Sequence, residues 1–275
     1  MRLVTWNCCR GAFARKAPLL EQWDADIAVL QEIARPERES EHCLWFGHNP
    51  RQGIGVVARE PYRLRALPRK IGVPRYAIPI EVTGPTRFNM LAVWAKGAQK
   101  HPYVEGVVRA FRLYRTMFAE SDAVLLGDLN SNPYWDAQHQ DDRSHTALVR
   151  MLSDAGLVSA YHEWNTEPHG QEKTPTYYFL WKEDRPYHID YCFLPRAWLP
   201  RVTHVEIGSF GAWKGHSDHR PLLVEVDDDL HTVSHDHSFR PHVPDAYELT
   251  SSRPGRHAAP RRDALLREEP VSLHR

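Results

Sequence analysis

Polar side chains that can do chemistry recur in this sequence where apolar stretches end. The stretch AVLLGDLNSNP, residues 123–133, indicates a buried strand followed by turn residues, and it places Asp128 and Asn130 at the mouth of that strand. In sheets of buried strands, ligands usually bind at this position. Gly-Asp-x-Asn is also an ordinary turn composition, so this stretch alone fits a structural role as well.

Other strand-like stretches end in similar residues. They are Asn7 in LVTWNCC, Glu32 in IAVLQEI, His188 and Asp190 in YHIDYCF, and Ser217, Asp218 and His219 in HSDHRPLLVEV. Each has a plain structural alternative: a turn residue at a strand end, a solvated acid at a helix start, or a local cap. Singly, none of them establishes a site.

Asp190 is the strongest single candidate. The alternation in HIDYCFL predicts that Asp190 and His188 share one face of a strand, opposite Ile189 and Tyr191. A carboxylate in a mainly apolar strand needs a partner. His219 could supply it, giving a carboxylate–imidazole pair that fixes the tautomer of the ring.

The elements that must position these residues alternate along the chain. Apolar patterns predict strands at residues 2–9, 26–32, 76–84, 87–95, 123–126, 176–181, 188–195, 202–208 and 221–227, and a hairpin within residues 53–68. Helical spacing appears at residues 16–25, 104–120 and 145–156, with Ser144 or Thr146 near the start of the last helix and Gly156 at its end. The mixture predicts two packed sheets with helices outside.

The character of the sequence changes after Asp227. Residues 228–275 are rich in Pro, His, Arg and Ser and have no sustained apolar period, which predicts a disordered tail after a domain of residues 1–227. Histidines in the tail could bind a transition metal, although a solvated run is the simpler interpretation.

The composition is that of a soluble globular protein. Hydrophobic residues make up 42% and charged residues 25%, and the formal net charge is zero, which argues against a shell that binds polyanions non-specifically. No signal peptide or membrane-length apolar stretch is evident, so we expect a cytoplasmic protein without a membrane partner. The four cysteines lack zinc spacing and are expected to be reduced thiols.

Taken in order, the motifs TWN, QE, GDLN, HIDY and SDHRPL resemble those of the endonuclease/exonuclease/phosphatase superfamily. This is the fold shared by deoxyribonuclease I, apurinic endonucleases and inositol polyphosphate 5-phosphatases. The resemblance covers about residues 1–227. It implies an α/β four-layer sandwich, in which two mixed β-sheets pack face to face with helices outside.

The resemblance also implies roles for the motif residues in metal-dependent phosphate ester hydrolysis. Asp128 would orient or deprotonate the attacking water, and His219, oriented by Asp190, would bind the scissile phosphate. Asn7 and Asn130 would hold phosphate oxygens, because amides donate hydrogen bonds to an anion without adding negative charge. A hard divalent cation, Mg²⁺ or Mn²⁺, would be bound by Glu32, with Asp218 as a second or water-mediated ligand.

One position departs from the superfamily pattern. Many relatives carry a histidine or tyrosine where this sequence has Trp94, at the end of the stretch FNMLAVW. Candidates to replace that contact with substrate are Lys96, His101, Tyr103 and His145, with Arg109 and His188 as further possible phosphate contacts. A solvated helix face is the alternative for Arg109, and a helix start is an ordinary place for His145.

The predicted function is therefore a phosphoesterase that hydrolyses phosphodiester bonds, acting on DNA or another nucleic acid. One alternative is a hydrolase of a small phosphorylated molecule. Another is a non-catalytic binding protein that retains the fold. Trp135, Tyr134 and Trp181 could stack on bases, close a small pocket or belong to the core. No obligate protein partner is inferred.

Overall fold

Two mixed six-stranded sheets form the centre of the molecule. The computed structural model of the 275-residue chain describes residues 1–97 and 103–228, and one compact unit spans Met1–Asp228. In each sheet a single neighbouring pair of long strands is parallel, β1 with β2 and β7 with β8, and the other pairs are antiparallel. The predicted tail falls outside the described residues from position 229 onward.

The strands divide between the sheets as follows. In spatial order the first sheet comprises β13 (Val202–Ile207), β14 (Leu222–Val226), β1 (Arg2–Asn7), β2 (Ile27–Ile33), β4 (Gln52–Ala58) and β3 (Cys43–Asn49). The second comprises β5 (Arg63–Ala66), β6 (Ala77–Thr83), β7 (Phe88–Trp94), β8 (Ala123–Asp128), β12 (Asp190–Pro195) and β9 (Leu157–Ser159). A separate short ribbon pairs β10 (Tyr177–Tyr178) with β11 (Pro186–Tyr187).

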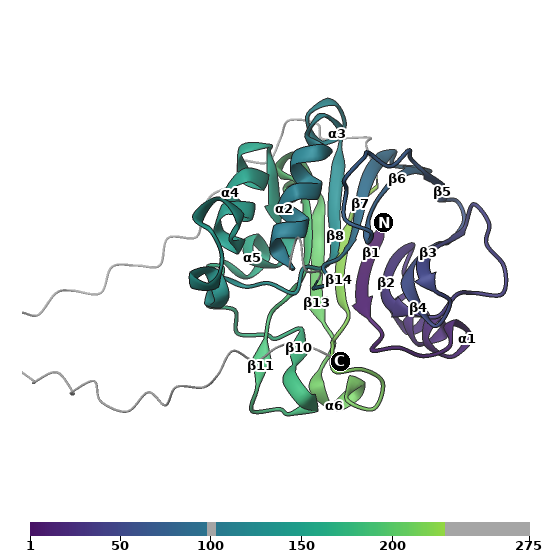
Figure 1. Ribbon diagram of the computed structural model, residues 1–275. Helices are drawn as coiled ribbons and strands as arrows, with labels where there is room; N and C mark the ends of the chain where they lie inside the picture. The colour runs from purple at the N-terminus through teal and green to yellow at the C-terminus, as the bar shows by residue number, and fades with distance from the viewer. Residues whose placement is uncertain (98–102, 229–275) are drawn as a thin grey trace, which may run out of the picture. The chain divides into compact units, whose positions relative to one another are not determined.

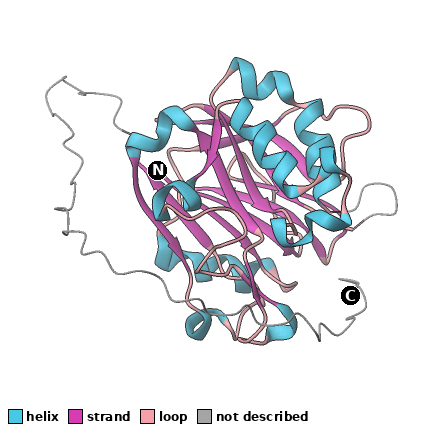
Figure 2. Ribbon diagram, turned by 90° about the vertical axis from the view of Figure 1, so that its left-hand side faces the viewer, coloured by secondary structure: helices cyan, strands magenta, loops and turns pink. Residues whose placement is uncertain are grey.

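The helices are short and lie outside the sheets (Figures 1 and 2). The α-helices are α1 (Phe13–Lys16), α2 (Val104–Leu113), α3 (Arg115–Glu120), α4 (His145–Asp154), α5 (Ala160–Asn165) and α6 (Phe210–Trp213). The 3₁₀ segments are η1 (Ala17–Trp23), η2 (Pro133–Gln138), η3 (Asp141–Arg143), η4 (Phe179–Trp181) and η5 (Arg196–Arg201).

Three apolar layers hold this arrangement together. The central layer lies between the sheets and joins side chains such as Val29 and Val56 from the first sheet to Ile80 and Leu126 from the second. A second layer packs α2, α3 and α4 on the outer face of the second sheet, and a third packs η1 on the outer face of the first. Because apolar layers cover the inner and outer faces of both sheets, the predicted four-layer sandwich is confirmed.

The structure corrects some of the predicted elements. Residues 53–68 do not form a hairpin, since β4 pairs with β2 and β3 whereas β5 pairs with β6 in the other sheet. The helical pattern over residues 104–120 is divided at Tyr114 into α2 and α3. The predicted strand at 176–181 narrows to the two residues of β10 before η4 begins.

Other expectations are met. Ser144 caps α4, because its side chain accepts a hydrogen bond of 3.2 Å from the backbone N–H of Ala147. All four cysteines are free thiols, with Cys8 buried and Cys9 partly buried. Among the described residues, no helix has both the length and the apolar character needed to cross a bilayer.

Candidate active site

Strands β8 and β12 place two carboxylates opposite each other at the end of the second sheet. The strands are antiparallel neighbours, and their register pairs Asp128 directly with Asp190. Both side chains are fully buried. Burying two acids side by side is unfavourable unless they share protons, hydrogen-bond donors or cations, so this pairing indicates a site rather than a packing detail.

Asn7 and Asn130 donate hydrogen bonds to both carboxylate oxygens of Asp128. The Asn7 side chain, at the end of β1 in the first sheet, donates Nδ2 to Asp128 Oδ2 at 2.9 Å. Asn130 donates its backbone N–H to Oδ1 at 2.8 Å and its Nδ2 to Oδ2 at 3.0 Å. Asn130 has φ of 45°, a left-handed conformation that asparagine tolerates better than most residues and that folds the loop back over the carboxylate.

Asp190 forms the predicted pair with His219. His219 Nδ1 lies 2.9 Å from Asp190 Oδ2, and His219 stands just before β14 of the first sheet. Thr176 Oγ1 accepts the backbone N–H groups of Ile189 and Asp190 at 2.9 and 3.0 Å, which fixes the start of β12. The second oxygen, Asp190 Oδ1, is buried and has no hydrogen-bond partner within the described part of the chain.

The pKa values of Asp128 and His219 depend on each other and on the neighbouring Asp190 and Asn7. Burial, and then the negative charge of Asp190, raises the pKa of Asp128, while His219 and the hydrogen bond from Asn7 oppose that rise. Burial alone would lower the pKa of His219. The charge and hydrogen bond of Asp190, with the charge of Asp128, outweigh it and raise that pKa above its ordinary value. The surroundings therefore favour the imidazolium form of His219.

The predicted metal ligands lie around Cys9 and Tyr177 rather than within this buried group. Burial raises the pKa of Cys9 to about 12, with further contributions from the charge and hydrogen bond of Asp218 and the charge of Glu32. Burial is the main cause of the raised pKa of Tyr177, and the charges of Asp218, Asp128 and Glu32 add to it. Glu32 has φ of 57° at a bulge in β2 and accepts Gln52 Nε2 at 2.9 Å.

This donor set fits a hard divalent cation. Carboxylate oxygens are the preferred protein ligands of Mg²⁺, which retains several waters and needs only one or two of them. The charges of Asp218, Asp128 and Glu32 all act on Tyr177, and the unpartnered Asp190 Oδ1 adds a buried oxygen that requires a positive partner.

Two of the residues expected to replace the missing contact, Lys96 and Tyr103, lie beside Trp94. Lys96 Nζ lies 3.3 Å from Gln52 Oε1, so a chain of polar contacts runs from Lys96 through Gln52 to Glu32. Burial raises the pKa of Tyr103, and the charge of Asp128 adds to it. A cavity of about 420 Å³ is lined by Tyr76, Trp94, Lys96 and Tyr103 among others. His101 falls outside the described residues.

Three predicted substrate contacts do not reach the site. His145 is fully buried and bonds Ser131 and His169. His188 does not share a face with Asp190. It precedes the first residue of β12, so strand alternation does not apply to it, and its ring lies 5.1 Å from that of Tyr191. Arg109 donates to Gly72 O at 2.6 Å.

The structure also adds residues that sequence reasoning missed. Tyr177 packs on the His219 ring with centroids 4.6 Å apart, and Thr176 anchors Asp190. Ser217 Oγ donates to Asn7 O at 2.7 Å and accepts the His219 N–H at 3.0 Å, which joins the end of β1 to the segment before β14 within the first sheet. The stretch TPTYY, residues 174–178, carries no motif, and no signal in the sequence indicated this role.

Aromatic rings continue outward from His219. Tyr177 lies 6.4 Å from Tyr187, Tyr187 lies 4.9 Å from Trp135, and Trp135 lies 5.6 Å from Tyr134, all between ring centroids. Tyr134 is 73% exposed and is therefore not a core residue. The rings form an aromatic track from the buried pair to the surface.

Known proteins resemble this chain in fold alone. No protein-family model matches the sequence, and no curated protein matches it. The 3'-5' exonuclease NExo from Neisseria meningitidis superposes with a TM-score of 0.57 at 20% identity, over 82% of this chain and 100% of its own. NExo is also described as a 3' phosphatase and has been solved with a product DNA hairpin.

Two further solved structures share this fold. The endonuclease domain of the TRAS1 retrotransposon has a TM-score of 0.59 at 15% identity, over 82% of this chain and 97% of its own. An AP endonuclease from Archaeoglobus fulgidus has a TM-score of 0.57 at 17% identity, over 82% of this chain and 99% of its own. These matches span nearly the full length of each neighbour and confirm the expected sandwich fold.

Proposed function

We propose that this chain, which has the deoxyribonuclease I-like fold, is a divalent-metal-dependent phosphoesterase that hydrolyses phosphodiester bonds in nucleic acid. The observation that carries the proposal is a pair of hydrogen bonds that cross between the sheets, Asn7 to Asp128 and His219 to Asp190. Together they gather a candidate base, an imidazolium and amide donors at one place, and we assign the activity to residues 1–227.

Each group has a task that its surroundings favour. Asp128 accepts the proton of the attacking water, and its raised pKa brings it closer to neutral pH, where a base is most effective. His219, kept charged by Asp190, donates Nε2–H to a phosphate oxygen. The second N–H of the Asn7 amide would be donated to the same phosphate, whereas Asn130 Nδ2 donates to Asp128 Oδ2 and Ala95 O and would reach a phosphate only by giving up the bond to Ala95. Mg²⁺ or Mn²⁺, held by Glu32 and Asp218, would stabilise the negative charge that develops on the phosphate oxygens.

The aromatic track favours nucleic acid as the substrate. Stacking of a base on an aromatic side chain stabilises single-stranded nucleic acid binding by about 1–3 kcal/mol per base. Tyr134 and Trp135 offer such a surface leading to His219. DNA is our specific proposal, because the neighbours in fold include an exonuclease, an AP endonuclease and a structure with a DNA hairpin.

The cavity beside Trp94 favours a second candidate, a small phosphate ester. Its volume of about 420 Å³ lies within the range of small-molecule sites, and Tyr76, Trp94 and Tyr103 could enclose one base or sugar. The net charge of zero also provides no broad basic surface for a duplex.

Substitution of Asp128→Asn tests the mechanism. Wild type and variant are assayed with nicked plasmid, a single-stranded oligonucleotide and bis-p-nitrophenyl phosphate, each with Mg²⁺ or Mn²⁺. We expect hydrolysis to fall about 10²–10⁴-fold in the variant while its circular dichroism is unchanged. Asp141→Asn, on the exposed η3, is the matched control and should retain activity.

The same assay separates the alternatives. A nuclease that contacts several phosphates loses activity steeply as salt rises, whereas hydrolysis of a small ester does not. Unchanged hydrolysis in the Asp128→Asn variant would remove the mechanism. Absence of hydrolysis of every substrate by wild type would favour a non-catalytic binding protein.

A further inference from the structure

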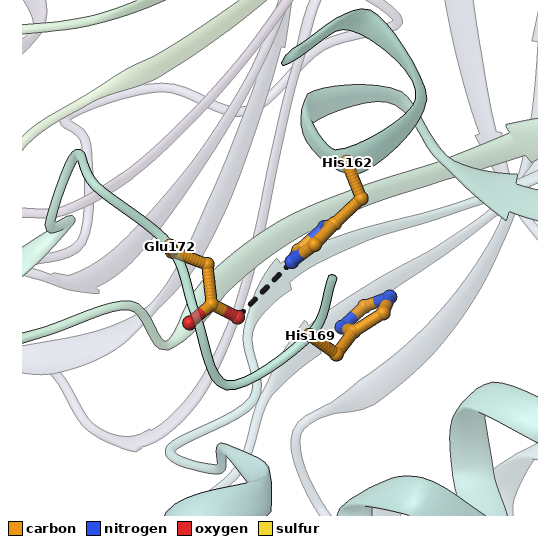
Figure 3. A group of neighbouring side chains, drawn as sticks. All are labelled: His162, His169 and Glu172. Atoms are coloured by element: carbon orange, nitrogen blue, oxygen red, sulfur yellow. Dashed lines mark hydrogen bonds and ion pairs between the residues drawn. The ribbon is translucent and has the colours of Figure 1, made fainter. Parts of the chain in front are cut away.

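A second polar cluster lies on the far side of β12 from the candidate active site. His162 of α5 and His169 and Glu172 of the following loop point toward one another (Figure 3). One ligand atom from each lies within 4.8 Å of the other two. The side chains of His162 and Glu172 are 6% and 5% exposed, so the cluster is almost closed to solvent.

Hydrogen bonds hold each ring from behind. His162 Nδ1 bonds Ser159 Oγ at 2.7 Å, and its Nε2 lies 3.0 Å from Glu172 Oε1. His169 Nδ1 lies 3.3 Å from His145 Nε2, and the other nitrogen of His145 bonds Ser131 Oγ at 2.8 Å. When His162 donates Nδ1–H to Ser159, its Nε2 carries the lone pair. This is the arrangement that supporting hydrogen bonds impose on metal-binding histidines.

The carboxylate is positioned in the same way. Glu172 accepts the backbone N–H of Gly170 at 2.9 Å and Asn132 Nδ2 at 3.2 Å. Two imidazoles with one carboxylate are an N/O donor set suited to Zn²⁺, whereas Mg²⁺ prefers oxygen ligands alone.

We propose that His162, His169 and Glu172 form a Zn²⁺ site distinct from the candidate active site. The separation of 3.0 Å between His162 Nε2 and Glu172 Oε1 is close to the roughly 3.4 Å expected between ligands in a tetrahedral site with bonds of about 2.1 Å. Three protein ligands leave one position for water.

Binding requires one adjustment. The His162 and His169 rings are stacked, with centroids 3.5 Å apart and planes at 13°. A metal ion binds in the plane of an imidazole ring, so two parallel rings cannot both coordinate it without a turn. His169 lies in a loop and is less buried than His162, and we assign the turn to its ring, which would give up its contact with His145 Nε2.

The site would brace the loop that follows Asp128. Asn132 donates Nδ2 both to Glu172 and to His188 O, at 3.2 and 3.1 Å, and thereby joins this loop to the start of β12. Zn²⁺ bound by Glu172 would fix Asn132 from the face opposite Asp190.

Metal content of the full-length protein tests the proposal. The protein is treated with chelator, incubated with Zn²⁺, passed through a desalting column and analysed by mass spectrometry for zinc. We expect about one ion per chain in wild type. The variants His162→Gln, His169→Gln and Glu172→Gln should each weaken zinc binding at least tenfold. His204→Gln, at an exposed histidine in β13, is the matched control and should not.

Two further variants identify where the ion lies. Asp128→Asn should retain the ion, which separates this site from the candidate active site and from failure of the proposed function. Replacing every histidine beyond residue 228 by Gln should also leave binding unchanged. Loss of the ion in either variant, or equal retention in wild type and Glu172→Gln, would overturn the proposal.

If the cluster variants do not fold, two measurements on the wild-type protein test the zinc site. Zn²⁺ should raise the Tm of the chelator-treated protein, because binding to the native state stabilises it by mass action. Co²⁺ in place of zinc should give the visible absorption of a tetrahedral site. No Tm shift and no such absorption would refute the site.

Discussion

Asp128 occupies an unusual setting for a carboxylate, since it is buried, bonded by amide donors and next to a second acid. Because its pKa is raised above the ordinary value of 3.8, the base form appears only at higher pH, and activity should rise with pH on a limb well above pH 4. The pKa of His219 is raised above its ordinary value of 6.5, so His219 loses its proton only at higher pH. This loss should set the alkaline limb of the pH–activity profile.

Asp190→Asn tests this coupling. The substitution removes the negative charge that raises both pKa values, so both limbs of the kcat/KM profile should move to lower pH while activity decreases. The measurement is the pH profile of wild type and variant at constant ionic strength. Limbs that stay in place would show that Asp190 does not control the protonation of Asp128 and His219.

Thr176 positions Asp190 without belonging to any recognisable motif. In Thr176→Val the shape is kept, but the buried N–H groups of Ile189 and Asp190 lose their acceptor. Each unsatisfied donor is destabilising by about 1–3 kcal/mol, so the free energy of unfolding in urea should fall by at least that amount and kcat should fall with it. Thr176→Ser retains the hydroxyl and should remain close to wild type. Equal stability of the Val variant would contradict the role.

The residues of the candidate site differ in how far the sequence could predict them. Asp128, Asn130 and Asp190 lie at strand ends within recognisable motifs, and the structure brings them together with Asn7 and His219. His188 was misplaced because β12 begins only at Asp190, after a segment shaped by the hydrogen bonds that Thr176 accepts from Ile189 and Asp190, and alternation cannot reveal such bonds. Tyr177 is set by the pairing of β10 with β11, a contact between short segments without an apolar period.

At the scale of elements, one glycine controls how β7 and β8 meet. Gly127 has φ of 151°, and a Cβ there would overlap the carbonyl of Val93 in the adjacent parallel strand. Gly127→Ala should therefore separate the strands beside Asp128 and lower the free energy of unfolding by about 3 kcal/mol or more, measured in urea.

The control for Gly127→Ala is Gly211→Ala in α6, where nothing lies within 4 Å of the added carbon. That variant should unfold at nearly the wild-type urea concentration. Similar stabilities of the two variants would mean that close contact between β7 and β8 is not required.

Elements were predictable to the extent that local patterns determine them. Buried strands such as β2, β7 and β8 and the helix α4 follow directly from apolar runs, helical spacing and the Ser144 cap. Local patterns could not predict which strands pair with one another. The alternation of residues 53–68 marks β4 and β5 correctly as strands, but their sheet membership depends on distant neighbours in the packed layers.

At the scale of the whole molecule, the candidate site spans both sheets, so its geometry should depend on the layer between them. Ile80 lies in this central layer and Leu152 lies in the layer under the outer helices, and both are fully buried. Ile80→Ala and Leu152→Ala should each lower the free energy of unfolding by about 2–5 kcal/mol. Only Ile80→Ala should also lower kcat, measured at a temperature where both variants are folded. Equal effects on kcat would show that the spacing of the sheets does not limit catalysis.

The order of strands has a consequence for how the protein is made. Residues 63–195 contain all of the second sheet, whereas the first sheet needs both ends of the domain, since β1 pairs with β14. Asp128 and Asp190 therefore lie in a sheet built from one continuous stretch of chain, whereas His219 stands just before β14, the last strand of the domain to be translated. The complete constellation can assemble only after that last strand has joined β1, so a chain that stops short of β14 should have the paired carboxylates without the imidazole.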